Sequence, residues 1–318
     1  MTKRRKRVLT AIGVVAVIGL VGFLVVQYAI ARNGPAVLDT VDRLTAGARD
    51  TQMLEKHVFG AAPAQKLAVY GPIEPDSSRP VLIFSHGGSW RAGDPDDYGF
   101  VARTFVPEGF VVVLAGYRLN PEVEFPAMLE DTASVVAWTR QNIHRHGGDP
   151  DAIFIAGHSA GAYNAVMTAL DSQWLAREGL QTEVLAGVIG LAGPYDFYPF
   201  DSDSTRASFS GAPDPGTTTQ PVAFVRGDAP PMLLMTGEKD TTVKPRNSRV
   251  LARQLEAAGG RADLRLFSEM DHYDILVRTA SPWSDRQIID EVRDFALPIA
   301  SSRQSGREAS VPVQGKTR

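Results

Sequence analysis

The sequence predicts an α/β fold, with a mostly parallel sheet covered by helices on both faces. Short apolar runs alternate along the chain with runs of helical periodicity, which is typical of strands and helices in turn. The length of 318 residues, with 44% hydrophobic and 22% charged residues, suits one large globular domain with appendages. A serine between two glycines also follows an apolar run and opens a helical one, as expected at the carboxyl edge of such a sheet.

The expected elements follow this alternation in order. Strands are expected at 81–84, 110–114, 152–156, 185–191, 231–235 and 262–267. Helices are expected at 126–144, 162–170, 249–258 and 285–297. The first of these helices places Leu129, Ala133, Val136 and Ile143 on one stripe, which indicates core packing.

The main domain is expected to cover 59–300. Within it, 195–230 is an insertion rich in turn-forming residues between two strands, and such segments often border a binding site. Residues 32–58 are expected to be a linker or a short amphipathic helix. The tail 301–318 is polar, contains Gly and Pro, and is expected to be disordered.

Residues 1–31 form a separate unit. The basic stretch 3–7 precedes an uncharged run, 8–30, that is long enough to span a bilayer. A signal peptide has an apolar core of only about 7 to 15 residues, so an uncleaved single-pass anchor is favoured. The alternative is secretion after cleavage near Ala31, which ends a small-x-small sequence. The basic stretch, against the single Arg32 beyond the run, predicts the amino end in the cytoplasm and the main domain outside it.

The composition excludes several classes of function. The chain has no cysteine, which excludes disulfides, thiol catalysis and thiolate-bound zinc. The net charge of -3, with no basic face beyond the first residues, argues against nucleic-acid binding. The close pair His144 and His146 lies where a helix runs out, so no metal site is expected, and nothing implies a cofactor. The oligomeric state stays open.

The strongest local signal is the pentapeptide 157–161, Gly-His-Ser-Ala-Gly. It has the form of a nucleophile elbow, a sharp strand-to-helix turn that holds a serine hydroxyl clear of the backbone. The positions two residues before and after Ser159 must be very small in such a turn, and both are glycine. The turn also aims the amide of Ala160 at whatever Ser159 attacks.

A serine nucleophile needs a base and an acid that orients it. His272 is the one histidine of six that follows the serine, and it lies in a loop directly after an expected strand. Asp240 is the preferred acid, because it lies in the turn after the apolar run 231–235; Glu238 in the same turn is the rival. A carboxylate there would accept the Nδ1 proton of His272 and leave Nε2 to take the serine proton.

A second oxyanion donor is expected from the loop after the strand 81–84. This loop reads Ser-His-Gly-Gly-Ser-Trp, and glycine lets a backbone amide of Gly87 or Gly88 approach the substrate oxygen beside Ala160. His86 and Trp90 are expected to shape the loop, with His272 filling the role of base.

On these motifs the sequence resembles the α/β-hydrolase superfamily, in the esterase branch with hormone-sensitive-lipase-like, arylformamidase-like and feruloyl-esterase-like enzymes. The resemblance covers about residues 55–298 and includes an opening, 65–70, that looks like the first strands of bacterial members. Lipase-like members carry a third glycine where this chain has Ser89, and the form His-Gly-Gly-x-Trp is closer to the arylformamidase-like and feruloyl-esterase-like members.

The resemblance implies a serine hydrolase that cleaves carboxylic esters. An arylformamidase or other amide hydrolase is the alternative, and a binding module of the same fold would normally lack one of the three residues. Tyr195, Phe197 and Tyr198 in the insertion are expected to form a pocket wall and to restrict the site to small or compact aromatic acyl groups.

Overall fold

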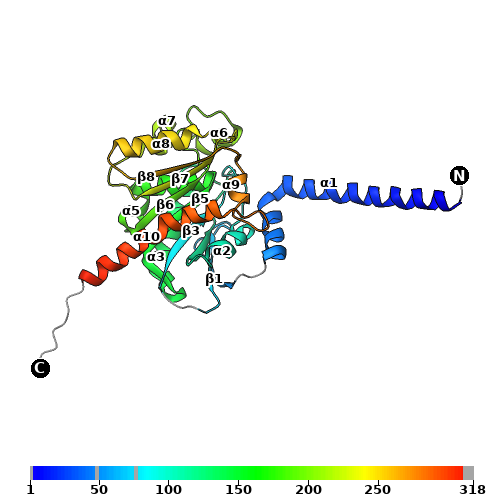
Figure 1. Cartoon of the computed structure of the whole chain (residues 1–318). Helices are drawn as coiled ribbons and strands as arrows, with labels where there is room; N and C mark the ends of the chain where they lie inside the picture. Colours follow the sequence, from blue (N-terminus) through cyan, green and yellow to red (C-terminus); the bar gives the residue numbers. More distant parts are fainter. Residues whose placement is uncertain (1–2, 47–49, 75–77, 311–318) are drawn as a thin grey trace, which may run out of the picture.

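The computed structural model describes residues 3–46, 50–74 and 78–310, and it contains one eight-stranded sheet (Figure 1). The strands are β1 Thr51–Val58, β2 Lys66–Pro72, β3 Arg79–Ser85, β4 Val111–Ala115, β5 Gly148–His158, β6 Leu185–Leu191, β7 Met232–Gly237 and β8 Ala262–Phe267. Their order is β1-β2-β4-β3-β5-β6-β7-β8. Strand β2 is antiparallel to β1 and β4, and the pairs from β4 to β8 are parallel, which confirms the predicted fold class.

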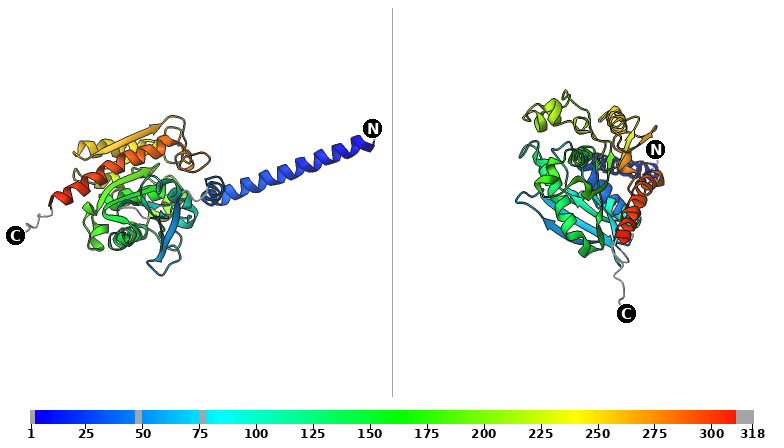
Figure 2. Two further views of the ribbon diagram at one scale, coloured as in Figure 1. Left: turned by 60° about the horizontal axis from the view of Figure 1, so that its bottom comes forward. Right: turned by 90° about the vertical axis from the view of Figure 1, so that its left-hand side faces the viewer.

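Helices cover both faces of this sheet (Figure 2). The α-helices of the described residues are α1 Lys3–Ala46, α2 Gly99–Phe105, α3 Ala127–Asn142, α4 Ala160–Leu170, α5 Gln173–Arg177, α6 Asp203–Phe209, α7 Pro215–Thr218, α8 Arg246–Ala257, α9 Asp274–Val277 and α10 Arg286–Ser310. Two separate apolar cores result, because alternate side chains of a strand point to opposite faces. On β3, for example, Val81 and Ile83 join the core under α3 and α4, whereas Leu82 and Phe84 join the core under α2 and α10.

The register brings the carboxyl ends of the central strands to one edge of the sheet. Ser85 at the end of β3 is paired with Gly157 of β5, and His158 of β5 is paired with Leu191 of β6. Loops that follow these strands therefore meet at the same place, which is where open α/β sheets carry their sites.

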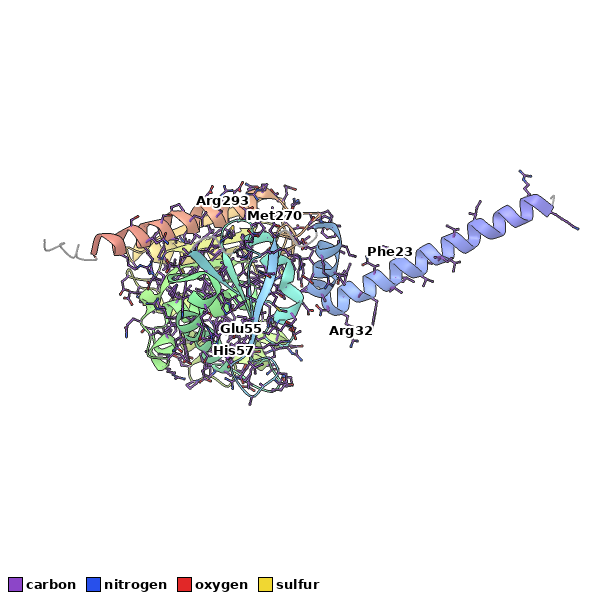
Figure 3. The ribbon with its side chains drawn as sticks, turned by 90° about the horizontal axis from the view of Figure 1, so that it is seen from below. Phe23, Arg32, Glu55, His57, Met270 and Arg293 are labelled. Carbon is purple, nitrogen blue, oxygen red and sulfur yellow. The ribbon has the colours of Figure 1, made fainter. Side chains whose placement is uncertain are left out.

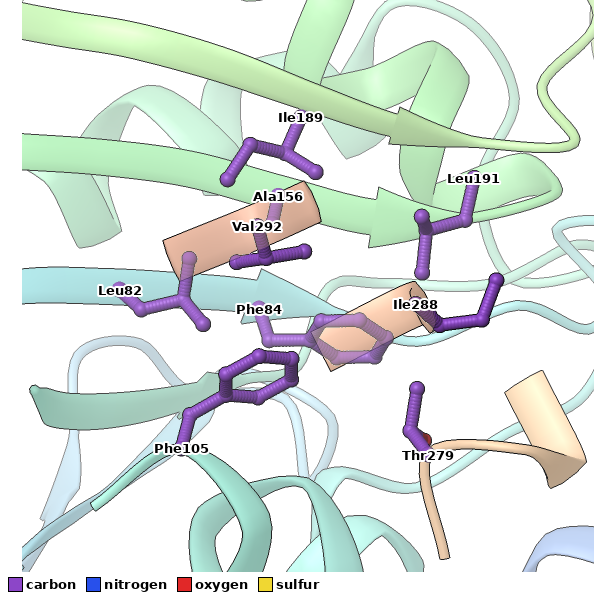
Figure 4. Close-up of a pocket in the computed structure, with 9 residues that line it drawn as sticks. All are labelled: Leu82, Phe84, Phe105, Ala156, Ile189, Leu191, Thr279, Ile288 and Val292. Carbon is purple, nitrogen blue, oxygen red and sulfur yellow. The ribbon is translucent and has the colours of Figure 1, made fainter. Parts of the chain in front are cut away.

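The core beneath α10 contains one small void, lined by side chains from β3, β5, β6 and α10 (Figure 4). Its volume is about 10 Å³ and its lining is apolar, so it holds at most one water and offers that water no partner beyond Thr279. We interpret it as imperfect packing of the core.

The structure differs from the expected boundaries at both ends. Within residues 32–58 the helical alternative agrees with the structure, because α1 continues to Ala46 beyond a kink at Asn33, but Thr51–Val58 is the edge strand β1 and not part of a linker. The tail is not irregular from residue 301, because α10 runs to Ser310. Arg303 explains the extra turns, since its guanidinium donates hydrogen bonds to the carbonyls of Asp151, Glu183 and Leu185. The last residues, 311–318, lie outside the described residues.

The first part of α1 projects from the domain with its apolar side chains exposed, as at Phe23 (Figure 3). Among the described residues it is the one helix long and apolar enough to cross a membrane. A helix that is apolar on all sides and exposed is typical of a membrane span, and a signal sequence has the same character.

Candidate active site

The turn between β5 and α4 has the geometry of a nucleophile elbow. Ser159 has φ 54° and ψ -118°, in the left-handed half of φ/ψ space that a non-glycine residue rarely occupies. A Cβ on Gly157 would lie 2.3 Å from the backbone carbon of Gly161, and a Cβ on Gly161 would lie 2.1 Å from the carbonyl oxygen of Ser85. Glycine is therefore required at both positions for the turn to close against β3.

Three side chains from three loops form a continuous hydrogen-bonded line at this turn. The Oγ of Ser159 lies 3.0 Å from Nε2 of His272, and Nδ1 of His272 lies 2.7 Å from Oδ2 of Asp240. All three residues are buried. The predicted nucleophile, base and acid are thus adjacent in the predicted order. One ring nitrogen of His272 faces Ser159 and the other faces Asp240.

Asp240 and Glu238 have different surroundings. The second oxygen of Asp240 accepts hydrogen bonds from the amides of Thr242 and Val243, at 2.9 and 2.8 Å, which fixes the carboxylate toward His272. Glu238 is exposed and pairs with Arg249 on α8. The geometry favours Asp240 over its rival.

His158, which no sequence argument singled out, supports the loop that carries His272. Its Nε2–H donates to the carbonyl oxygen of His272 at 2.9 Å, and the two rings lie 4.8 Å apart. Burial and the neighbouring imidazole lower the pKa of His158 to about 3, so this ring stays neutral. The sequence signal for His158 was its position directly before the serine. The elbow motif tolerates any residue at that position, so the signal did not distinguish His158.

The loop after β3 lies against the elbow. A Cβ on Gly87 would lie 3.1 Å from the carbonyl oxygen of His158 and 3.4 Å from Cβ of Ser159, so a larger residue would crowd the nucleophile. Gly88 has φ 122° and keeps the chain in a conformation that favours glycine. The loop and the amino end of α4, where the first amides of a helix lack intrahelical partners, thus face the same space beside Ser159.

This loop also lies close to Tyr98. Burial raises the pKa of the Tyr98 phenol, and the backbone of Gly87 offsets part of that shift. Among the described residues, no hydrogen-bond acceptor faces the amide of Gly88 or that of Ala160.

His86 shapes the loop from within. Its Nδ1–H donates to the carbonyl oxygen of Gly87 at 2.8 Å, and its ring stacks on Tyr117 with centroids 4.4 Å apart. Burial lowers the pKa of His86 to about 4, so the ring is neutral near pH 7. It contacts neither Ser159 nor His272 by any hydrogen bond in the described part of the chain.

Trp90 and the insertion pack together beside the loop. The indole of Trp90 donates to Oδ1 of Asn164 at 3.1 Å and packs edge-on against Tyr163 and Phe209. Phe197 stacks on the same indole, with centroids 6.2 Å apart.

The expected pocket wall therefore has a different role. Tyr195 is fully buried in the loop after β6, Phe197 faces Trp90, and Tyr198 is half-exposed beside Phe200. None of the three borders the cavity in front of Ser159. The sequence identified an aromatic cluster in this insertion but not the direction in which it packs.

The cavity in front of the serine has a volume of about 890 Å³. Gly87, Gly88, Ser159 and His272 line one part of it, and Tyr273, Leu276, Val277 and Trp283 line another. The rest of the wall comes largely from α1, through residues 30–35, 37, 38 and 41. These residues of α1, which lie at and after the end of the apolar run, are thus part of the candidate site.

This part of α1 is fixed to the domain by a buried ion cluster. Arg103 on α2 contacts Asp39 at 2.5 Å and Asp42 at 2.6 Å, and all three side chains are nearly or fully buried. The other oxygen of Asp42 accepts the amide of Ser281 at 2.7 Å. At the kink, Asn33 accepts the amide of Ala36 and donates to Asp97, so it caps the second half of the helix.

Within the part of the chain that the structure describes, no group of three or more His, Asp and Glu side chains is arranged to hold a metal ion. The site consists of a serine, an imidazole, a carboxylate and backbone amides.

Together the sheet order and the turn at Ser159 define an α/β-hydrolase fold. The chain belongs to the BD-FAE family, whose model matches residues 67–255. It is 30% identical over 257 residues to the esterase LipQ of Mycobacterium tuberculosis, covering 76% of this chain and 60% of LipQ. It is 28% identical over 247 residues to a kynurenine formamidase of Danio rerio, covering 76% of this chain and 78% of that protein. The chain thus spans less than two thirds of the length of LipQ.

Solved structures share the fold. Esterase B from Lactobacillus rhamnosis superimposes with a TM-score of 0.74 at 19% identity, covering 90% of this chain and 96% of that one. A carbohydrate esterase from gut microbiota superimposes with a TM-score of 0.69 at 18% identity, covering 79% of this chain and 96% of that one.

Proposed function

We propose that the protein hydrolyses carboxylic esters, with Ser159 as nucleophile, His272 as general base and acid, and Asp240 as the group that orients His272. The observation that carries this proposal is the hydrogen-bonded line from Asp240 through His272 to Ser159 beneath an open cavity. Family membership and the esterases among the relatives support it.

The reaction follows from the positions of the atoms. Oγ of Ser159 attacks the ester carbonyl while Nε2 of His272 takes its proton, and the carbonyl oxygen becomes an oxyanion. The amides of Ala160 and of Gly87 or Gly88 stabilise this charge. His272 then returns its proton to the departing alkoxide, and water hydrolyses the acyl-enzyme by the same route.

The acyl half of the substrate is proposed to be small or a compact aromatic group. Trp90, Tyr163, Phe197 and Phe209 are packed against one another beside the oxyanion loop. None of these rings lines the cavity in front of Ser159, so the packed cluster offers no channel for a long acyl chain.

Labelling of the full-length protein with a fluorophosphonate tests the nucleophile. We expect the native chain to be labelled and to hydrolyse p-nitrophenyl acetate, and Ser159→Ala to lose both while keeping its fold. A native chain that folds but resists the label and cleaves no ester would contradict the proposal and revive a non-enzymatic role.

A second candidate is an amide hydrolase of the arylformamidase type. The form His86-Gly87-Gly88-Ser89-Trp90 favours it, and a kynurenine formamidase is among the relatives. The same nucleophile and oxyanion donors would serve both reactions. A kcat/KM for an aryl formamide above that for every ester in a panel would move the assignment to this candidate.

We further propose that residues 8–30 anchor the protein in a membrane with the catalytic domain outside the cytoplasm. The apolar side chains of this helix are exposed rather than packed in the domain. The basic stretch before the helix favours this orientation. Cleavage near Ala31, which would release the enzyme, is the alternative.

A further inference from the structure

Residues of α1 at the end of the apolar run also line the cavity in front of Ser159. Ile30 is the last residue of the uncharged run, and it lines the cavity together with the next turns of the helix. If the run spans a bilayer, its last turn lies at the membrane surface. The mouth of the cavity is then at the same level.

Contacts between α1 and the domain fix the position of this cavity opening relative to the apolar run. Residues 36–46 of α1 are the docked half of this helix, and within it Asp39 and Asp42 form ion pairs with Arg103. Asn33, at the kink, donates a hydrogen bond to Asp97. Both contacts lie within about one or two turns of the residues that wall the cavity. If the run spans a bilayer, these contacts set the orientation in which the domain meets the membrane, and α1 leaves the domain from one side (Figure 1).

Exposed aromatic side chains surround the same mouth. Tyr273 is 61% exposed and Trp283 is 50% exposed, and both line the cavity. Tyr28, on the last turns of the span, accepts a hydrogen bond from Arg32. Aromatic and basic residues at such positions are typical of side chains that lie at the boundary between lipid and water.

Apolar side chains that line the cavity follow His272 in the chain, and others come from α1. His272 must protonate the departing oxygen, so the alkoxy half of an ester lies next to this ring and to the residues that follow it. There the wall is formed by Leu276, Val277 and Trp283, with Val37 and Val41 of α1. The rings around Trp90 are packed against one another and do not line this cavity, so they provide no second channel for a long chain.

From these observations we infer that the substrates are amphiphilic esters dissolved in the membrane to which the enzyme is anchored, with a short acyl group on a long-chain alcohol. This inference rests on the proposed ester hydrolysis and on an uncleaved α1. The alkyl chain of the alcohol enters the α1-walled cavity directly from the bilayer, and the ester group reaches Ser159 at the surface.

The test uses the full-length protein reconstituted in phosphatidylcholine vesicles that contain hexadecyl acetate. We expect hydrolysis of hexadecyl acetate in the enzyme's own vesicles to be at least about tenfold faster than in added enzyme-free vesicles, because the mouth opens to one bilayer only. Methyl hexadecanoate, which reverses the short and long halves, should be at least about tenfold poorer. Equal rates from both vesicle populations, or a preference for methyl hexadecanoate, would overturn the inference.

Matched variants locate the entry route. Val37→Asn and Trp283→Ser should lower the ratio of hexadecyl acetate to p-nitrophenyl acetate hydrolysis by about tenfold. Thr40→Asn, on an exposed face of the same helix, and Tyr198→Ser, which is 49% exposed in the insertion, should leave that ratio unchanged. A ratio that stays constant in all four variants would exclude the wall as an entry route.

The proposed function and the inference about its substrates can be contradicted separately. A chain that hydrolyses p-nitrophenyl acetate but no bilayer ester contradicts only this inference. A chain that hydrolyses neither, and whose Ser159 resists fluorophosphonate, contradicts the proposed function itself. A mature amino terminus at Arg32 would also overturn the inference, because the span would be missing.

Discussion

Asp240 and Glu238 lie two residues apart, but only Asp240 is buried against His272 and held by two backbone amides. We expect Asp240→Asn to lower kcat by about a thousandfold or more, because an amide at this position favours the wrong tautomer of His272. Glu238→Gln should change kcat by less than about twofold, since it removes an exposed pair with Arg249. Steady-state kinetics of both variants with p-nitrophenyl acetate decide which carboxylate is the acid. A larger loss of kcat in Glu238→Gln than in Asp240→Asn would make Glu238 the acid.

The two neutral histidines near the site make stability depend on pH. Burial lowers the pKa of His86 from 6.5 to about 4 and that of His158 from 6.5 to about 3. The unfolded chain therefore binds more protons than the folded one below pH 6.5, and protonation favours unfolding. We expect the free energy of unfolding to be greatest above pH 6.5 and to fall by about 1.4 kcal/mol per pH unit for each histidine down to about pH 4.

Denaturant unfolding between pH 7 and pH 5 measures this slope. His158→Gln should remove about half of it, and substitution of the exposed His144 by Gln should leave it unchanged. A stability that stays level between these pH values would show that neither ring is held neutral by burial.

The sequence predicted Ser159, His272 and Asp240 as neighbours because each follows a strand of a parallel sheet, where loops converge. It could not predict the partner of His158. That contact joins residues 114 positions apart through one ring nitrogen and one carbonyl oxygen, and it depends on the detailed path of the loop after β8.

At the scale of elements, the strand-turn-helix unit around Ser159 tolerates no side chain at its glycines. We expect Gly161→Ala to destabilise the protein by more than about 3 kcal/mol or to prevent folding, because its Cβ would lie 2.1 Å from the carbonyl oxygen of Ser85. Gly179→Ala is the control. Its φ of 72° is unfavourable for alanine, but the surrounding space is open, so it should cost only about 1 kcal/mol. Equal unfolding midpoints in denaturant would contradict this argument.

The docked half of α1 depends on Arg103. Arg103→Ala leaves Asp39 and Asp42 buried without their cation, which costs about 3 kcal/mol or more. We expect amide hydrogen exchange over residues 36–46 to accelerate by about a hundredfold while exchange in β5 stays slow. The exposed Arg91→Ala is the control, and unchanged exchange in Arg103→Ala would show that apolar contacts alone hold the helix.

This docking explains why the boundary of the domain was misplaced. Residues 36–46 carry a short amphipathic pattern, which is compatible with a free linker helix or with a docked one. The deciding partner, Arg103, lies 61 residues beyond Asp42 and gives no local signal. The extension of α10 was missed for the same reason, since Arg303 reaches carbonyls more than 100 residues earlier.

At the scale of the whole molecule, the span and the domain should lie on defined sides of the membrane. We expect protease added to intact spheroplasts to digest the catalytic domain, because a basic stretch before a span favours a cytoplasmic amino end. A cytoplasmic marker protein serves as the control for leakage. A domain that is protected until lysis would contradict the orientation.

The ends of the described chain point in opposite directions, with α1 leaving one side of the domain and α10 the other (Figure 2). A solid support or a reporter joined after α10 would therefore stand on the far side of the domain from the mouth of the cavity. Molecules attached to a sensor chip in this way would all stand upright with α1 uppermost. A supported lipid film could then be assembled over them, and turnover could be followed optically in a single oriented layer.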